Sequence, residues 1–193
     1  MPNRVRSLTA DNIEKVLSDY VASAEEIGDS IAGYSGIKLL EALKREAVGS
    51  GPYPNVAMFE AANRIMTDLV MLYGVRWLLK RGGLPFASYH VEYGHENNNA
   101  HDVTATENNL IFAGEVFNVA PSFYPIKKSS ALKKLRSGKR VPDVKMLIVN
   151  HDAVGNDYSP RLSAGEAILL VKVGTDEAIL MPSRNKTDPD CHA

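Results

Sequence analysis

The chain has 193 residues, of which 45% are hydrophobic and 23% are charged, and its formal net charge is −1. This composition is typical of a globular protein that buries a core, and it excludes a disordered or low-complexity chain. The single cysteine, Cys191, excludes an intramolecular disulfide and a zinc cluster built from cysteines, and no apolar run reaches the ~18 residues of a membrane span. We expect a cytoplasmic protein without a membrane partner.

The first half of the sequence has the periodicity of helices. Apolar residues spaced by three and four predict helices over residues 9–24, 35–47 and 58–80, with a glycine- and proline-rich loop at residues 49–54. The second helix is expected to turn three apolar side chains inward: Ile37, Leu40 and Leu43.

From residue 86 the pattern becomes extended. Strands are predicted over residues 86–93, 101–106 and 110–119, and Asn108 and Asn109 form a plausible hairpin turn between the last two. The order of a helix followed by a three-stranded meander predicts an antiparallel start to the sheet.

The last third alternates between helix and strand. Good helix formers predict a helix over residues 126–136, and buried-type runs predict strands over 144–150, 167–173 and 178–181. A return to strands after a helix implies an α/β (α+β) fold, in which helices cover the faces of a mixed central sheet.

The elements divide the chain into three expected parts. Residues 1–55 form an N-terminal helical extension that packs on the core, and residues 56–183 form the α/β core. Residues 184–193 form a C-terminal tail.

The charged residues are distributed unevenly. Residues 126–145 contain eight lysines and arginines against one acid, Asp143, so this segment carries +7 and the rest of the chain −8. A basic element on a weakly acidic protein often contacts phosphate groups, although the same pattern also occurs as a solvated helix face.

Two acids are the strongest candidates for a functional site. Glu115 lies inside an apolar strand, where a buried carboxylate is costly unless a cation or hydrogen-bond donors compensate it. Alternation places Glu115 on the face of Phe117 and opposite to the face of Val116. Asp102, in the preceding strand of the hairpin, would lie across from Glu115, so that both acids can share one divalent cation.

Each acid also has a structural interpretation. Asp102 follows the polar loop at residues 97–99 and can bond backbone amides, while Glu115 can pair with a neighbouring lysine. Glu92 can approach Asp102 as an additional metal ligand. The surrounding segment is rich in residues that can bind zinc or a second cation: His90, Glu92, His95, Glu96 and His101.

Residues 58–150 resemble the PD-(D/E)XK nuclease superfamily, to which many restriction and repair endonucleases belong. The resemblance consists of a helix, a three-stranded meander, a helix and a further strand, in the order that this family uses. Residues 101–103 (HDV) look like its PD element, and residues 114–117 (GEVF) look like its (D/E)XK element. The resemblance implies a restriction-endonuclease-like core.

The resemblance also implies roles for individual residues. Asp102 and Glu115 would bind Mg²⁺, with Mn²⁺ as an alternative ion. Glu60, early in the long helix, is similar in placement to an acid that many members contribute from their first core helix.

One position departs from the family pattern. Phe117 stands where the family has a lysine that orients or activates the attacking water. In some members this charge comes from a nearby helix, and the resemblance then implies that Lys127 or Lys128 supplies it.

The sequence therefore predicts a metal-dependent endonuclease that hydrolyses phosphodiester bonds of DNA, as a type II restriction enzyme does. Double-stranded DNA and a homodimer are the partners that the resemblance implies. The predicted DNA contacts are Lys127, Lys128, Lys133, Lys134 and Arg136.

Two alternatives remain open. Phe117 favours a catalytically inactive, nuclease-like module that binds nucleic acid or another protein. The other alternative is a regulatory, partner-binding protein unrelated to nucleases, whose lysine-rich helix is merely solvated.

Overall fold

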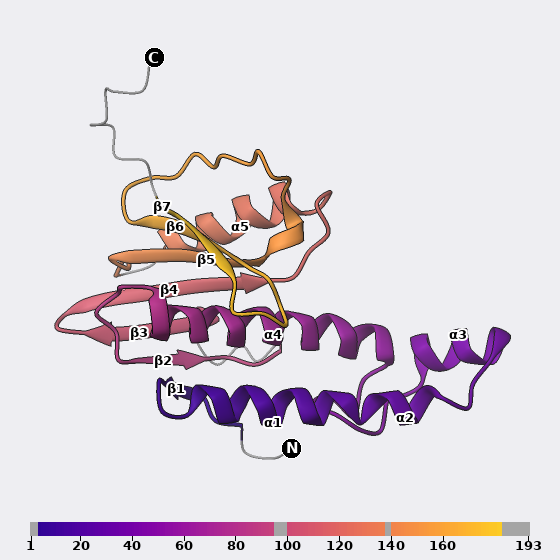
Figure 1. Cartoon of the computed structure of the whole chain (residues 1–193). Helices are drawn as coiled ribbons and strands as arrows, with labels where there is room; N and C mark the ends of the chain where they lie inside the picture. Colours follow the sequence, from indigo (N-terminus) through magenta and orange to yellow (C-terminus); the bar gives the residue numbers. More distant parts are fainter. Residues whose placement is uncertain (1–3, 95–99, 138–139, 183–193) are drawn as a thin grey trace.

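A seven-stranded sheet in the order β1-β2-β3-β4-β5-β6-β7 forms the centre of the molecule (Figure 1). The computed structural model describes residues 4–94, 100–137 and 140–182. Its elements in chain order are β1 (Ser7–Thr9), α1 (Ile13–Glu25), α2 (Ile27–Ile31), α3 (Gly36–Arg45), α4 (Met58–Arg81), β2 (Ser88–Val91), β3 (Val103–Glu107), β4 (Leu110–Phe117), α5 (Tyr124–Arg136), β5 (Val144–Asn150), the short 3₁₀ helix η1 (His151–Ala153), β6 (Glu166–Val171) and β7 (Ala178–Pro182). The predicted mixed α/β sheet is confirmed.

The strand directions follow from the connections. Strands β1 to β4 form an antiparallel meander, and the β3–β4 hairpin turns at Asn108 and Asn109, whose φ angles are 49° and 67°. Positive φ at both central residues matches the right-handed twist of a hairpin, which is why asparagine is favoured there. Strands β4, β5 and β6 are parallel, and α5 is the crossover between β4 and β5.

The two faces of the sheet are covered by different helices. Val116 belongs to the hydrophobic cluster under α4, whereas Phe117 belongs to the cluster under α5. Glu115 therefore shares the α5 face with Phe117, as strand alternation predicts. Both α4 and α5 begin at the end of the sheet where β4 and β5 terminate (Figure 1).

The N-terminal part is more closely joined to the core than an extension. Strand β1 pairs with β2, with Leu8 opposite Tyr89, and α1 packs along α4. Beyond β1, helices α2 and α3 form an arm that projects past the sheet (Figure 1). The sequence did not predict β1 or α2, because three and five residues are too short to show a period.

The expected inward face of α3 is wrong. Ile37 is 76% exposed and Leu40 is 61% exposed, while Ala42 is the buried residue of this helix. The helical spacing identifies an amphipathic helix, and Leu43 is half-buried as predicted, but Ile37 and Leu40 lie in solvent.

Close packing of α4 on the sheet depends on Gly74. A Cβ atom at this position would lie 2.5 Å from Ile148 Cγ2, on the neighbouring strand β5. We expect Gly74→Ala to lower the free energy of unfolding by about 1 to 2 kcal/mol, because overpacking outweighs the gain in helix propensity. A urea titration measures the change. A more stable variant would show that the helix can shift away from β5 without cost.

Among the described residues, no helix combines the length and apolarity needed to cross a bilayer. The predicted tail at residues 184–193, with Cys191, lies outside the described residues.

Candidate functional site

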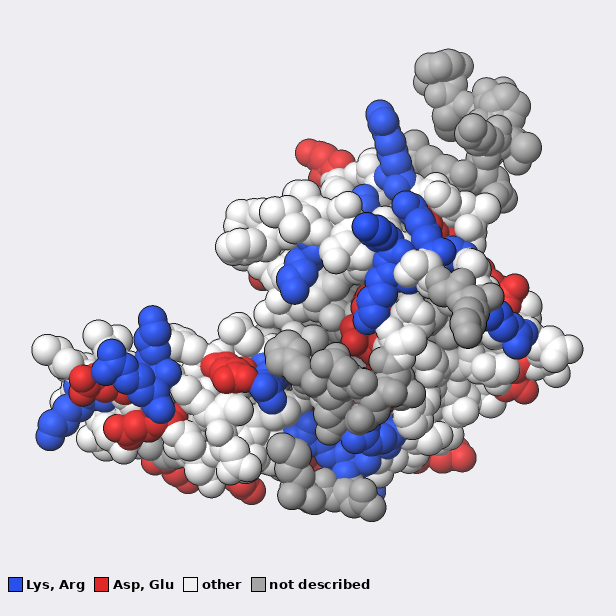
Figure 2. All heavy atoms as spheres, turned by 180° about the vertical axis from the view of Figure 1, so that it is seen from behind, with Lys and Arg blue, Asp and Glu red and all other residues white. Residues whose placement is uncertain are grey.

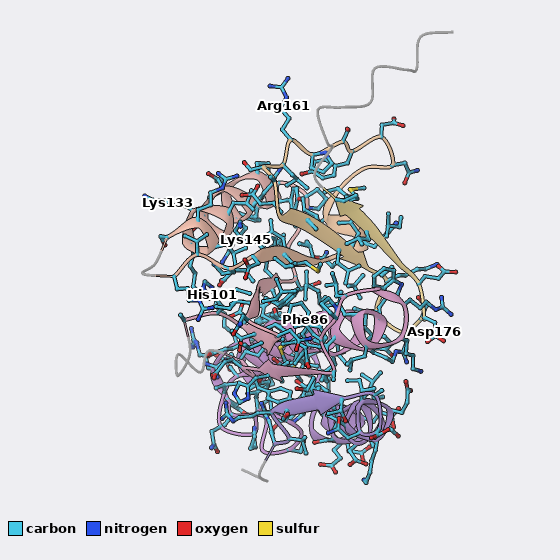
Figure 3. The ribbon with its side chains drawn as sticks, turned by 90° about the vertical axis from the view of Figure 1, so that its left-hand side faces the viewer. Phe86, His101, Lys133, Lys145, Arg161 and Asp176 are labelled. Carbon is cyan, nitrogen blue, oxygen red and sulfur yellow. The ribbon has the colours of Figure 1, made fainter. Side chains whose placement is uncertain are left out.

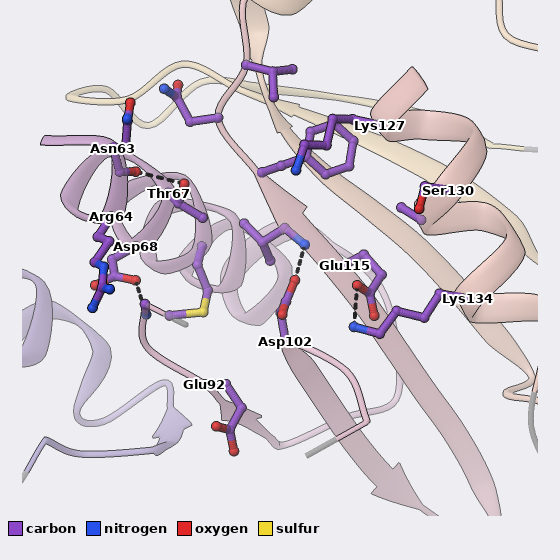
Figure 4. Close-up of a pocket in the computed structure, with 17 residues that line it drawn as sticks. Asn63, Arg64, Thr67, Asp68, Glu92, Asp102, Glu115, Lys127, Ser130 and Lys134 are labelled. Atoms are coloured by element: carbon purple, nitrogen blue, oxygen red, sulfur yellow. Dashed lines mark hydrogen bonds and ion pairs between the residues drawn. The ribbon is translucent and has the colours of Figure 1, made fainter. Parts of the chain in front are cut away.

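A cavity of about 360 Å³ opens beside the end of the β3–β4 ladder. The pairing of these strands stops at Val103 and Gly114, and the cavity lies beyond this point, between α4, the last residues of β4, and α5 (Figure 4). It is the place where a side chain from either helix can meet the two predicted acids.

The predicted acids lie together in this cavity. Asp102, Glu115 and Glu92 all line it. The ladder places Val103 opposite Gly114, so Asp102, one residue before β3, lies across from Glu115. Asp102 Oδ2 accepts a hydrogen bond from the Val116 N–H at 2.8 Å, which fixes the carboxylate against β4.

Glu115 is held by two cationic or protonatable groups. Its Oε2 lies 2.7 Å from Lys134 Nζ, and its Oε1 lies 2.7 Å from His101 Nδ1. The carboxylate is nearly buried, with 9% of its side chain exposed. These contacts are the compensation that a carboxylate inside an apolar strand requires.

Both acids are harder to ionise than free carboxyl groups. Burial raises the pKa of Glu115, and the neighbouring charge of Asp102 raises it further, against the opposing effects of Lys134 and His101. Burial also raises the pKa of Asp102, opposed by the Val116 N–H and the charge of Lys134. Two desolvated carboxylates with mutual repulsion gain from any cation placed between them.

Lys134 contacts Glu115 in place of the predicted Lys127 or Lys128. Positions 127 and 134 of α5 both face the cavity, because they are two helical turns apart. Lys128 is rotated away by one residue, and its Nζ donates to Tyr158 Oη at 2.8 Å. The sequence identified a lysine from the helix but not the correct turn of that helix.

The remaining basic residues of α5 have separate positions. Lys133 points away from the sheet into solvent (Figure 3). Arg136 forms two hydrogen bonds to the buried Glu166 of β6, at 2.6 and 2.9 Å. This ion pair ties α5 to the sheet, so Arg136 has a structural role besides the predicted contact with DNA.

Glu60 is not among the residues that line the cavity, although it was predicted for the site. It forms an ion pair with Arg64, one turn further along α4. Arg64 itself lines the cavity, opposite the lysines of α5. The cavity therefore has acids on its floor and a cation on each wall.

Asp68 is an acid of the cavity that the sequence reasoning missed. It lies in α4, is 1% exposed, and accepts hydrogen bonds from Tyr20 Oη at 2.6 Å and from the Gly94 N–H at 2.9 Å. The Tyr53 hydroxyl donates to the same oxygen as Tyr20. Asp68 shows the same sequence signal as Glu115, an acidic residue within an apolar segment.

Among the described residues, His90, Glu92 and His101 of the predicted cluster do not form a metal-ligand group. His90 is exposed on the opposite side of β2 from the buried Val91, and it does not line the cavity that Glu92 lines. Glu92 lies 3.5 Å from Arg6, while its backbone N–H donates to the Asp102 carbonyl at 2.9 Å. His95 and Glu96 lie outside the described residues.

Within the described ranges, no three His, Cys, Asp or Glu side chains converge into a complete metal-ligand set. Mg²⁺ does not require one, because it keeps several waters and takes one or two carboxylates together with substrate phosphate. Among the described residues, Asp102 Oδ1 accepts no hydrogen bond, which leaves it available to a cation. The donor set thus fits Mg²⁺ better than zinc.

Removing the charge of Asp102 should stabilise the metal-free protein. Burial raises the pKa of this carboxyl in the folded protein. The ionised carboxylate therefore lowers the stability of the fold above that pKa, and this destabilisation disappears below the unfolded-state pKa of about 3.9. Asp102→Asn should therefore be more stable than wild type at neutral pH, with a difference that shrinks as the pH falls. Urea titrations across this range measure it. A less stable variant at neutral pH would contradict the assigned penalty.

Comparison with models of known protein families gives no match, and no curated protein matches the sequence.

Proposed function

We propose that the protein is a metal-dependent endonuclease with a restriction-endonuclease-like core, acting on DNA at the cavity of Asp102 and Glu115. The observation that carries the proposal is the convergence of these two acids with Lys134 at the end of a meander strand. Together they provide negative charge for a cation and positive charge for a phosphate at one place. A divalent ion bound there would polarise the scissile phosphodiester and lower the pKa of an attacking water.

The protein's own residues would position the reactants. Asp102, fixed by the Val116 N–H, and Glu115 would offer carboxylate oxygens to the ion. Lys134 would stabilise the charge that develops on the phosphate, and Arg64 would hold a phosphate from the opposite wall. Lys134 thus takes the place of the lysine that Phe117 replaces.

The direct test of the function is cleavage of supercoiled plasmid and of labelled duplex oligonucleotides by the purified protein. We expect nicking or cutting in Mg²⁺ or Mn²⁺ and none in EDTA. DNA that stays intact in both ions under conditions where it is bound would favour an inactive, nucleic-acid-binding module instead.

Lys134 should matter more than its neighbours for cleavage. We expect Lys134→Gln to slow cleavage about a hundredfold, since it removes a positive charge aimed at the reacting phosphate. Lys133→Gln is the matched control, because this side chain is exposed and does not line the cavity. Single-turnover cleavage rates distinguish the two variants. Equal losses in both would mean that α5 contributes only general attraction to DNA.

A further inference from the structure

Two large apolar side chains are exposed at the start of the basic helix α5. Phe123 is 63% exposed and Ile126 is 72% exposed, although both are flanked by buried or charged residues. A well-folded monomer gains nothing from placing such side chains in water beside lysines. Their position relative to the cavity indicates what they contact.

Phe123 continues the cavity-lining stripe of α5. The helix lines the cavity with Lys127, Ser130, Ala131 and Lys134, a spacing of three and four that defines one helical face. The Lys127 N–H donates to the Phe123 carbonyl at 3.1 Å, so Phe123 lies one turn before Lys127 on this face. Phe123 is not among the lining residues itself, but it precedes them on the same face of α5 and is exposed.

The opposite wall has the same order of side chains. Helix α4 lines the cavity with Asn63, Arg64 and Thr67, and one turn before Asn63 lies Phe59, which is also exposed. Both helices begin on the same side of the sheet (Figure 1), so on each wall an exposed phenylalanine precedes the lining residues at the start of the helix, and we call this side of the cavity its mouth. From this mouth inward, a ligand would meet apolar groups first and then cations.

The charge around the mouth limits the kind of ligand. Helix α5 has five basic residues and no acid, and Lys127 is exposed at the rim. Figure 2 shows Lys and Arg side chains gathered on the part of the molecule that holds α5. An occupant that is anionic along its backbone and flat and apolar at regular intervals is a nucleic-acid strand.

We propose that Phe123 stacks on an unpaired base of the nucleic-acid strand whose phosphates follow Lys127 and Lys134 into the cavity. In a continuous duplex the base faces are covered by neighbouring bases, so a phenyl ring on the rim finds a partner only where a base is unpaired or unstacked. Ile126 covers the edge of the same base. This assignment deepens the proposed function, and it makes single strands, or duplexes with unpaired ends, the preferred substrate over blunt duplex.

The test measures binding without cleavage. Fluorescence anisotropy in EDTA would compare a labelled 20-nucleotide single strand with the blunt duplex of the same sequence, at several salt concentrations. The variants are Phe123→Ala, Phe123→Trp and Lys127→Gln. Tyr34→Ala, which removes an exposed aromatic ring from the arm, is the matched control.

The proposal predicts different effects for the ring and for the charge. Phe123→Ala should weaken single-strand binding about tenfold without changing the salt slope, because stacking involves no counterion release. Phe123→Trp should restore the affinity. Lys127→Gln should reduce the salt slope by about 0.7, the value for one phosphate of a single strand. Tyr34→Ala should leave both quantities unchanged.

Several outcomes would overturn the stacking role. It fails if Phe123→Ala binds the single strand as wild type does, or if it weakens single strand and blunt duplex equally. It also fails if the wild type prefers the blunt duplex or binds neither form, as a surface for another protein would. These binding results are independent of cleavage. If the wild type cuts DNA but Phe123→Ala binds normally, the nuclease function stands and the stacking role fails. If Phe123→Ala weakens single-strand binding but the wild type cuts no DNA, the stacking role stands and the nuclease function fails.

Discussion

Asp102→Asn should lower the rate of metal-dependent DNA cleavage by at least about a thousandfold while leaving DNA binding intact. The change removes the negative charge that we propose to hold the cation, but it keeps the side-chain shape and an oxygen for the Val116 N–H. A loss of this size corresponds to about 4 kcal/mol of transition-state stabilisation, which is typical for a metal that polarises a phosphate. Glu115→Gln should have an effect of similar size. Single-turnover cleavage and anisotropy in EDTA measure the two quantities.

Asp143→Asn provides a closely matched control. Asp143 Oδ2 accepts the N–H of Ile111 at 2.8 Å, so it makes the same kind of contact with the opposite end of β4, far from the cavity along the strand. Asp143→Asn tests whether the loss of cleavage in Asp102→Asn comes from a weakened contact with β4 or from the loss of the metal-binding charge. Cleavage by Asp102→Asn at the wild-type rate, or an equal loss in Asp143→Asn, would contradict the assigned role.

Asp68→Ala should lower the free energy of unfolding by roughly 3 to 5 kcal/mol. The carboxylate accepts hydrogen bonds from α1, from the loop before α4 and from the loop after β2, through Tyr20, Tyr53 and Gly94. Arg4 lies 3.8 Å from the same carboxylate. Truncation would leave the Tyr20 and Tyr53 hydroxyls and the Gly94 N–H without this acceptor.

Two substitutions separate the loss of the hydrogen-bond acceptor at Asp68 from the loss of its charge. Burial raises the pKa of Asp68, and the hydrogen bonds from Tyr20 and Tyr53 oppose this shift. Asp68→Asn keeps one acceptor oxygen and should lose less stability than Asp68→Ala. Asp19→Ala, which removes an exposed partner of Lys15, should change the free energy of unfolding by less than about 1 kcal/mol. If Asp68→Ala were as mild as Asp19→Ala in urea titrations, the network would not secure the N-terminal helices.

Strands β2 to β7 could be predicted because their signals are local, whereas β1 is too short to show a period. The asparagine pair fixed the β3–β4 register, and alternation then placed Glu115 and Phe117 on one face and Asp102 across the hairpin. The arm could not be predicted correctly, because the spacing of Ile37 and Leu40 shows which residues share a face but not whether the core covers that face.

In the candidate site, too, the contacts between neighbouring strands could be predicted and the contacts made by the helices could not. The acids come from neighbouring strands, so the register alone brings them together. Lys134 and Arg64 reach the cavity through the rotation and tilt of α5 and α4, which no pattern within either helix specifies. Lys128 follows the cavity-lining Lys127 by one residue, about 100° of helix rotation, and contacts Tyr158. Lys134, two turns after Lys127, contacts Glu115.

The central claim is that Asp102 and Glu115 hold one divalent cation, and calorimetric titration of Mn²⁺ into the metal-free protein tests it most directly. We predict one site per chain in the wild type and in Asp143→Asn, and at least about tenfold weaker binding in Asp102→Asn and Glu115→Gln. Equal Mn²⁺ affinity in Asp102→Asn and wild type, or a wild type that binds no Mn²⁺, would contradict the account.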